Sequence, residues 1–206
     1  MDFLLFYFFN HVYRMCPNLN SLFDIEERLG LNKKTQPELK STIMNKNVQV
    51  NSENGITIIT AYAVIEAPKA TVWEVLGQPG KIEDFHPLIE NSYMISEKKN
   101  GVGSKLHCDL RPMGAMDEMI KEWIEGDSFT AEVTGGKMMP PYKFMRGSIE
   151  LNEFEGDTKV IFTFSYMLKF GLLGRMMDQF FIRSQFKKAP PQYVNGLKEF
   201  IESGYK

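Results

Sequence analysis

Three glycine-containing turns constrain this sequence more than any other feature. Asn100-Gly101, Gly126-Asp127 and Gly156-Asp157 each lie between runs in which apolar and polar residues alternate. Such alternation is typical of a strand with one buried face, and a Gly beside Asn or Asp between two such runs indicates a β-hairpin. The stretch from Ile56 to Lys206 therefore predicts six or seven antiparallel strands followed by a helical tail. This arrangement tends to enclose apolar space.

The composition excludes several classes of partner and cofactor. The chain of 206 residues has a formal net charge of -2, so no field of one sign is available to hold nucleic acid or an anionic membrane. Cys16 and Cys108 form no disulfide framework, and the three histidines have no metal-ligand spacing. We therefore expect a cytoplasmic protein with no metal or nucleotide cofactor and no nucleic-acid partner.

The first fifty residues differ from the rest. Phe3–Phe9 is an apolar run, too short for the roughly 20 residues that span a bilayer and without the basic segment of a signal peptide. We expect residues 1–50 to be an extension, a product of start-site choice or loosely docked, with the functional protein beginning near Met44. The alternative is a membrane-targeting role for Phe3–Phe9. Membrane contact is otherwise expected only during transient lipid exchange, and the oligomeric state stays open.

Two of the hairpins predict an apolar inner face. With Gly156-Asp157 as the loop, Leu151 pairs with Phe162 and Ile149 pairs with Phe164. With Asn100-Gly101 as the loop, Tyr93 pairs with Cys108 on the apolar face, while His107 falls on the solvent face.

The third hairpin turns carboxylates toward the interior. With Gly126-Asp127 as the loop, Ile120 pairs with Val133, and both Glu118 and Glu122 share the face of Ile120. A carboxylate in an apolar interior is costly, and its pKa rises. Either the two glutamates reach solvent at the frayed ends of this face, or one of them, preferentially Glu118, anchors a ligand. The faces agree only if the connection near Gly114 has an odd length or a bulge.

Helices are expected on both sides of the strands. Pro68–Leu76 predicts a helix that ends at Gly77, and Gly80–Phe85 predicts a second short turn. Pro190-Pro191 lies between two apolar stripes of the C-terminal segment, so we expect a kink or break there. The stripes are Leu173, Met176, Met177 and Phe180, then Tyr193, Leu197, Phe200 and Ile201.

Several local motifs occur in an order that resembles a known superfamily. They are Ile65–Trp73, Phe85-His86-Pro87, Gly101-Val102-Gly103, Glu118–Trp123 and Gly156–Val160. In this order they resemble the START-type superfamily, which includes birch-pollen-allergen-like proteins, polyketide cyclases and dehydrases, and lipid-transport proteins. The resemblance covers about residues 54–204 and implies an α+β helix-grip fold. In that fold two short helices follow the first strand, and a curved antiparallel sheet wraps a long C-terminal helix around a hydrophobic cavity.

This resemblance leaves two functions open, because one fold hosts many activities. The first is non-catalytic binding or transport of a small hydrophobic or amphipathic ligand, lipid-like or polyketide-like, with Glu118 or Tyr166 orienting its polar end. The second is a polyketide cyclase, aromatase or dehydratase with Glu118 as general base and Tyr93, Tyr166 or His107 steadying an enolate. The expected ligand-binding residues are Tyr93, Cys108, Leu110, Glu118, Ile120, Phe129, Ile149, Phe162, Phe164, Tyr166, Met177 and Phe180.

Overall fold

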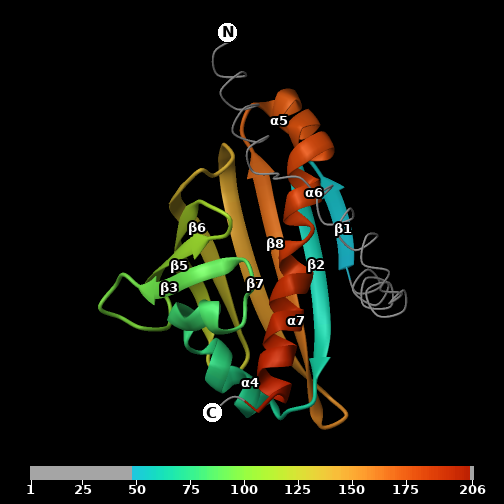
Figure 1. The fold of residues 1–206 in the computed structure, drawn as a ribbon. Helices are drawn as coiled ribbons and strands as arrows, with labels where there is room; N and C mark the ends of the chain where they lie inside the picture. The colour runs from blue at the N-terminus through green and yellow to red at the C-terminus, as the bar shows by residue number, and fades with distance from the viewer. Residues whose placement is uncertain (1–47, 205–206) are drawn as a thin grey trace, which may run out of the picture. The chain divides into compact units, whose positions relative to one another are not determined.

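The computed structural model describes residues 48–204, so the predictions for Phe3–Phe9 and Met44 lie outside the described residues. It contains one antiparallel sheet in the order β1-β2-β8-β7-β6-β5-β4-β3 (Figure 1). The strands are β1 Val48–Glu53, β2 Ile56–Ile65, β3 Ile89–Met94, β4 Lys105–Leu110, β5 Ala115–Ile124, β6 Ser128–Lys137, β7 Tyr142–Phe154 and β8 Asp157–Leu168.

The helical elements follow β2 and β8, as the sequence predicts. A short α-helix and a 3-10 turn connect β2 to β3, and the remaining helices form the C-terminal segment. They are α4 Lys69–Leu76, η1 Pro79–Asp84, α5 Gly171–Met177, the π-helix η2 Asp178–Ile182, α6 Arg183–Phe186 and α7 Ala189–Glu202.

The sheet has one strand more than the sequence predicts, because β1 pairs with β2 along its whole length. Asn54 and Gly55 join them, and both have positive φ, 52° and 83°. Two successive left-handed residues make the type I′ turn that matches the twist of a hairpin. The sheet therefore begins at Val48, inside the stretch assigned to an extension.

The β7–β8 hairpin differs from its predicted register by two residues. Its loop is Glu155-Gly156, with φ of 53° and 93°, rather than Gly156-Asp157. Ile149 therefore pairs with Phe162. Because side chains alternate with a period of two, a shift of two residues leaves every side chain on its predicted face.

The predicted β3–β4 register is wrong by one residue. Tyr93 pairs with His107, and Ser92 pairs with Cys108. The strands are joined by residues 95–104 instead of a two-residue turn, so the turn motif does not set the pairing. A shift of one residue moves a side chain to the opposite face. Tyr93 consequently lies on the outer face with His107.

The β5–β6 hairpin contains a β-bulge that changes the predicted faces. Ile120 pairs with Ala131, but the register shifts before Glu122, which pairs with Thr130. Glu118 therefore faces inward, as predicted. Glu122 faces outward, where the Thr130 hydroxyl donates to its Oε2 at 2.8 Å. The prediction that Glu122 faces the interior is wrong, because the bulge inserts one unpaired residue between Ile120 and Glu122.

The expected irregularity near Gly114 is present. β4 ends at Leu110 and β5 begins at Ala115, and the Leu110 amide donates to the Gly114 carbonyl at 2.9 Å, which closes an odd-length turn of Arg111 to Met113. This odd-length turn pairs Cys108 with Met116 and Leu106 with Glu118, so the inner faces of β4 and β5 agree.

The C-terminal helical segment is interrupted just before Pro190 and Pro191. Between α6 and α7, Lys187 and Lys188 lie outside both helices, and Pro190 and Pro191 occupy the first turn of α7. The first turn has no preceding carbonyl to bond, so the missing proline N–H groups cost little there. The predicted break is confirmed.

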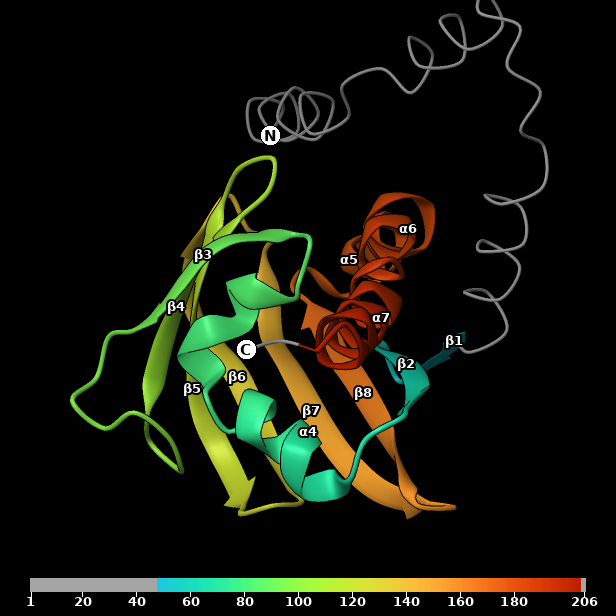
Figure 2. The same cartoon turned by 60° about the horizontal axis from the view of Figure 1, so that its bottom comes forward.

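The sheet curves around α7, which packs mainly against β2 and β8 (Figure 2). Val194 and Leu197 of α7 are almost fully buried, as are Ala61 of β2 and Val160 of β8. Burying one such aliphatic side chain contributes about 1.5–3 kcal/mol. The helix is therefore held to one half of the sheet. Within residues 48–204, no helix is long and apolar enough to cross a membrane.

Candidate functional site

The candidate site lies inside the sheet and centres on Glu118. Enclosure by protein raises the pKa of this carboxyl from 4.5 to about 7. No residue between 48 and 204 donates a hydrogen bond to the carboxylate, and yet the side chain keeps some accessible surface. A carboxyl that is enclosed, unpaired and still accessible borders interior space that protein atoms do not fill.

The apolar residues beside Glu118 support the same conclusion. Leu106, Cys108 and Ile120 face inward and have at most 1% of their surface exposed. By contrast, some inner-face residues of β3, β4, β5 and β8 are only partly buried. Because α7 lies over β2 and β8, it leaves the inner face of β4 and β5 less covered (Figure 2). The partly buried residues are Met94, Leu110, Met116, Trp123 and Phe162.

Tyr193 of α7 contributes a second polar group. Its ring stacks on Phe162 with centroids 4.5 Å apart and contacts Phe85 edge-on at 5.1 Å. Burial, followed by the nearby charge of Glu118, holds the pKa of the phenol well above its usual value, so it stays protonated. Its hydroxyl has no hydrogen-bond partner in the described part of the chain.

Sequence reasoning missed Tyr193 as a site residue, although its apolar stripe was recognised. A hydroxyl within a stripe that packs toward a sheet is the signal that could have found it. When a tyrosine ring packs in the interior, its hydroxyl is buried as well and usually forms a hydrogen bond there. Tyr193 and Glu118 are thus candidate polar contacts on opposite walls.

Two further buried titratable groups, Cys108 and His86, are neutral at physiological pH. Burial, and next the charge of Glu118, raises the pKa of the Cys108 thiol far above its usual range. Burial lowers the pKa of His86 to about 4, and the Leu88 amide donates to its Nδ1 at 3.1 Å. Neither group is an activated nucleophile.

Tyr166 is buried on the inner face, but it is not free to orient a ligand. Its hydroxyl donates to Asp178, which also accepts from Thr57 at 2.8 Å and from Arg183 Nε at 3.0 Å. The predicted role of Tyr166 as an anchor is therefore wrong, because Asp178 in the helical segment that follows β8 already accepts from its hydroxyl. Phe164 beside it packs against Phe186 of α6, at a centroid distance of 5.4 Å.

Three other predicted site residues lie away from this interior. Tyr93 is 46% exposed on the outer face, Phe180 is 66% exposed, and Met177 is half-buried in α5. An apolar stripe at helical spacing says that one face is apolar but not what covers it. The π-helix that starts at Asp178 also changes the helical period between Met177 and Phe180.

His107 lies on the outer face beside Tyr93, so it cannot act on a molecule near Glu118. Its ring nitrogens contact Asp117 Oδ1 at 2.6 Å and Asp109 Oδ1 at 3.3 Å. The hydrogen bond with Asp117 raises the pKa of His107. No group of three or more His, Cys, Asp or Glu side chains within residues 48–204 is placed to hold a metal ion.

The remaining predicted residues lie on the inner face. Cys108, Ile120, Phe129 and Ile149 are buried there, and Phe162 borders Tyr193. The structure thus brings residues of β4, β5, β6, β7 and β8 to one face around Glu118 and leaves Tyr93, Met177 and Phe180 outside it.

Comparison with known proteins identifies the fold. No protein family and no curated protein matches the sequence. The crystal structure of Ara h 8.0201 is similar, with a TM-score of 0.61 and 12% identity over 73% of this chain and 100% of that one. Ginseng major latex-like protein 151 from Panax ginseng has a TM-score of 0.55 and 18% identity over 73% of this chain and 97% of that one.

A third similar structure is the Zhui aromatase/cyclase from Streptomyces sp. R1128. Its TM-score is 0.54, with 13% identity over 72% of this chain and 98% of that one. At these identities the likeness shows the fold and not the activity. The helix-grip fold expected from the sequence resemblance is confirmed.

Proposed function

We propose that this chain binds or carries a small hydrophobic or amphipathic molecule, lipid-like or polyketide-like, in the interior beside Glu118. The observation that carries the proposal is the Glu118 carboxyl, which is enclosed and has no protein hydrogen-bond partner in the described residues. An unpaired buried polar group costs stability, so its retention is explained if a ligand or water bonds to it. The proposed binding unit is the domain of residues 54–204 together with β1, in a cytoplasmic protein.

The lining favours a ligand that is mostly apolar with one polar end. Leu110, Met116 and Phe162 offer apolar and aromatic surface, and methionine adapts its shape to varied ligands. With a pKa of about 7, the Glu118 carboxyl both donates and accepts hydrogen bonds in its neutral form. The Tyr193 phenol adds a donor on the facing wall. A hydroxyl or carbonyl group on the ligand suits this pair.

Native mass spectrometry of the full chain tests this proposal. We expect a bound apolar molecule in protein purified from cells or incubated with lipid extract and aromatic polyketides. Glu118→Gln should weaken binding of ligands with a polar end. Glu122→Gln is the matched control, because Glu122 lies on the same strand but faces outward. Unliganded protein throughout these panels would overturn the proposal.

A second candidate function is catalysis of the cyclase, aromatase or dehydratase type. The pKa of Glu118, about 7, suits a general base near neutral pH. One protein with the same fold is an aromatase/cyclase. Turnover of a poly-β-ketone substrate mimic should then be lost in Glu118→Gln and kept in Glu122→Gln, while both variants still bind the mimic. Activity that survives Glu118→Gln rules this mechanism out.

A further inference from the structure

The helical segment after β8 has an arrangement opposite to that of an ordinary surface helix. Leu172, Phe180 and Phe170 are 75%, 66% and 63% exposed. The buried positions of the same segment are Gly174, Asp178 and one apolar residue, Ile182. A helix packed on a core normally buries its apolar residues and exposes its polar ones. Here large apolar side chains point away from the protein.

This exposure is not the fraying of a loose end. Asp178 is 5% exposed and accepts hydrogen bonds from Thr57 of β2, Tyr166 of β8 and Arg183 of α6. Gly174 packs so closely that a Cβ atom there would lie 2.0 Å from the Lys169 carbonyl oxygen. The segment is therefore fixed to the sheet with its apolar face outward.

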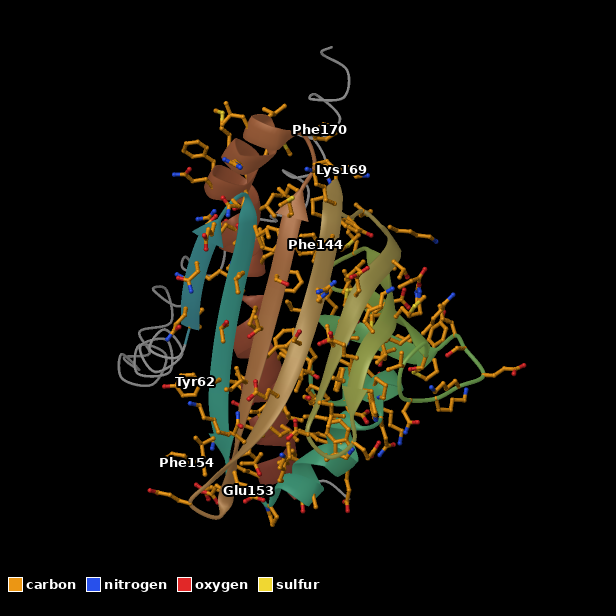
Figure 3. The ribbon with its side chains drawn as sticks, turned by 180° about the vertical axis from the view of Figure 1, so that it is seen from behind. Tyr62, Phe144, Glu153, Phe154, Lys169 and Phe170 are labelled. Carbon is orange, nitrogen blue, oxygen red and sulfur yellow. The ribbon has the colours of Figure 1, made fainter. Side chains whose placement is uncertain are left out.

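The same end of the sheet carries further exposed apolar residues. The Lys169 amide donates to the Pro141 carbonyl at 2.9 Å, which joins the connection between β8 and α5 to the β6–β7 loop. Met138 in that loop is 36% exposed, and Met113 of the adjacent β4–β5 connection is 42% exposed. Figure 3 shows Phe170 and Lys169 at this end, opposite Glu153 and Phe154.

A hollow of about 640 Å³ at this end has two lysines in a mostly uncharged lining. Lys143 and Lys169 both border it, as does one carboxylate, Glu132. Arg146 already pairs with Glu132 at 2.7 Å. The hollow therefore presents uncompensated positive charge beside the exposed apolar helix face.

Basic residues are concentrated in the two segments that form this surface, residues 137–143 and 169–188. Their one acidic residue, Asp178, is buried and paired with Arg183. The chain as a whole has a net charge of -2, so the positive charge is local. The basic residues are Lys137, Lys143, Lys169, Arg175, Arg183, Lys187 and Lys188.

We propose that this surface, formed by residues 137–143 and 169–188, docks on an anionic phospholipid bilayer. The exposed residues of α5 and η2 would enter the interfacial region, as the apolar face of an interfacial helix does. The lysines around them would lie at the level of the anionic headgroups. A protein partner would need a matched shape, whereas a bilayer requires only apolar residues ringed by positive charge.

Vesicle co-sedimentation of the full chain tests the docking. We expect association with phosphatidylcholine vesicles that contain about one third phosphatidylserine, and much less with phosphatidylcholine alone. Leu172→Ser combined with Phe180→Ser should lower the association at least tenfold, roughly the effect of two large apolar side chains. Lys169→Glu should weaken association with phosphatidylserine vesicles, and the effect should shrink at high salt.

Matched controls lie elsewhere on the molecule. Phe154→Ser removes a 46% exposed aromatic at the opposite end of the sheet, and Lys99→Glu reverses an exposed lysine of the β3–β4 loop. Both should bind vesicles as the wild type does. Circular dichroism should confirm that every variant is folded, which is expected because each altered side chain is exposed.

Several results would overturn the proposal. One is equal binding by the wild type and the Leu172→Ser, Phe180→Ser variant. Another is loss of vesicle binding in Phe6→Ser with Phe8→Ser alone, which would assign it to the N-terminal run. A third is a dimer that the double variant dissociates without any change in vesicle binding. Glu118→Gln should still bind vesicles, so this proposal and the ligand-binding proposal fail separately.

Discussion

The two ends of the sheet differ in which side chains they bury and which they expose. At the end that carries α4, the indoles of Trp73 and Trp123 pack edge-on at 5.0 Å, and both donate to Glu125 at 2.7 Å. Lys69 pairs with Asp127 at 2.6 Å. At the end that carries α5, the carboxylate of Asp178 is buried, as are Leu168 and Ile182, and several large apolar residues of α5 and η2 are exposed. The interior of the α4 end is apolar, with Val72, Val75 and Leu76 buried and its polar bonds at the surface, whereas the interior of the α5 end contains a buried ion pair.

Because of this difference, we expect apolar residues at the α4 end to stabilise the fold and exposed apolar residues at the α5 end to contribute little to stability. Apolar residues at the α4 end contribute to folding because they leave water when the chain folds. Apolar residues of α5 gain little in this way, so their presence needs another explanation, such as a partner surface. Substitutions of similar chemistry at the two ends should therefore have very different effects.

The largest effect is expected at Asp178. Asp178→Ala leaves Arg183 without its carboxylate and the hydroxyls of Tyr166 and Thr57 without their acceptor. Breaking a buried ion pair in this way costs about 3–5 kcal/mol of the free energy of unfolding. Urea denaturation measures it. Glu125→Ala at the α4 end should cost much less, because Glu125 is exposed; equal losses would mean that the two ends do not differ.

The next effect is expected in α4. Leu76 is 2% exposed, so Leu76→Ala removes buried apolar surface and leaves a cavity. Such substitutions cost about 3 kcal/mol of the free energy of unfolding. Thermal denaturation followed by circular dichroism measures the loss. A loss below about 1 kcal/mol would mean that the α4 end is not closed by packing.

A smaller change in the free energy of unfolding, dependent on pH, is expected at Glu118, which lies between the two ends of the sheet. Glu118 titrates near 4.5 in the unfolded chain and near 7 in the folded protein. The folded protein holds this proton more tightly, so its contribution to stability is full below pH 4.5 and is lost as the pH rises to 7. Glu118→Gln cannot ionise and should become the more stable protein across this window.

The gain of Glu118→Gln above pH 7 should be about 2 kcal/mol, less than the full shift implies, because the side chain keeps some accessible surface. Urea denaturation at several pH values measures it. Glu122→Gln should not change the pH profile in this way. Parallel profiles for the wild type and Glu118→Gln would show that Glu118 is solvated like a surface group.

The smallest effect is expected at Leu172. This residue is 75% exposed, so Leu172→Ala should change the free energy of unfolding by less than about 0.5 kcal/mol. The comparison with Leu76→Ala uses the same chemical change at the opposite end of the sheet. A cost similar to that of Leu76→Ala would show that Leu172 packs against protein in solution.

The sequence correctly predicted which side chains face inward wherever the two-residue alternation of a strand is unbroken. The faces of β7 and β8 are as expected, although their register differs by two residues, because parity decides the face. Glu118 was placed inward because it lies two residues from Ile120. The β1–β2 turn was missed despite its Asn54-Gly55 signal, because the strand before it is polar.

The failures have physical causes that the sequence does not display. The long β3–β4 loop displaces Tyr93 by one residue, since a turn motif within a long loop does not set the pairing. The outward face of α5 could not be predicted, because periodicity does not reveal what covers an apolar stripe. Net charge concealed the basic surface, since the acidic residues lie in other segments.

The bulge between Ile120 and Glu122 has a consequence for how this interior could change over generations. Strict alternation over residues 118–123 would put Trp123 on the face opposite to Glu118, because side chains alternate with a period of two. The extra residue of the bulge brings Trp123, whose ring meets Trp73, to the face of Glu118. The number of residues in β5, as well as their identity, therefore decides which side chains line the interior. Insertions and deletions here are the mutations that could give a descendant a new ligand in a single step.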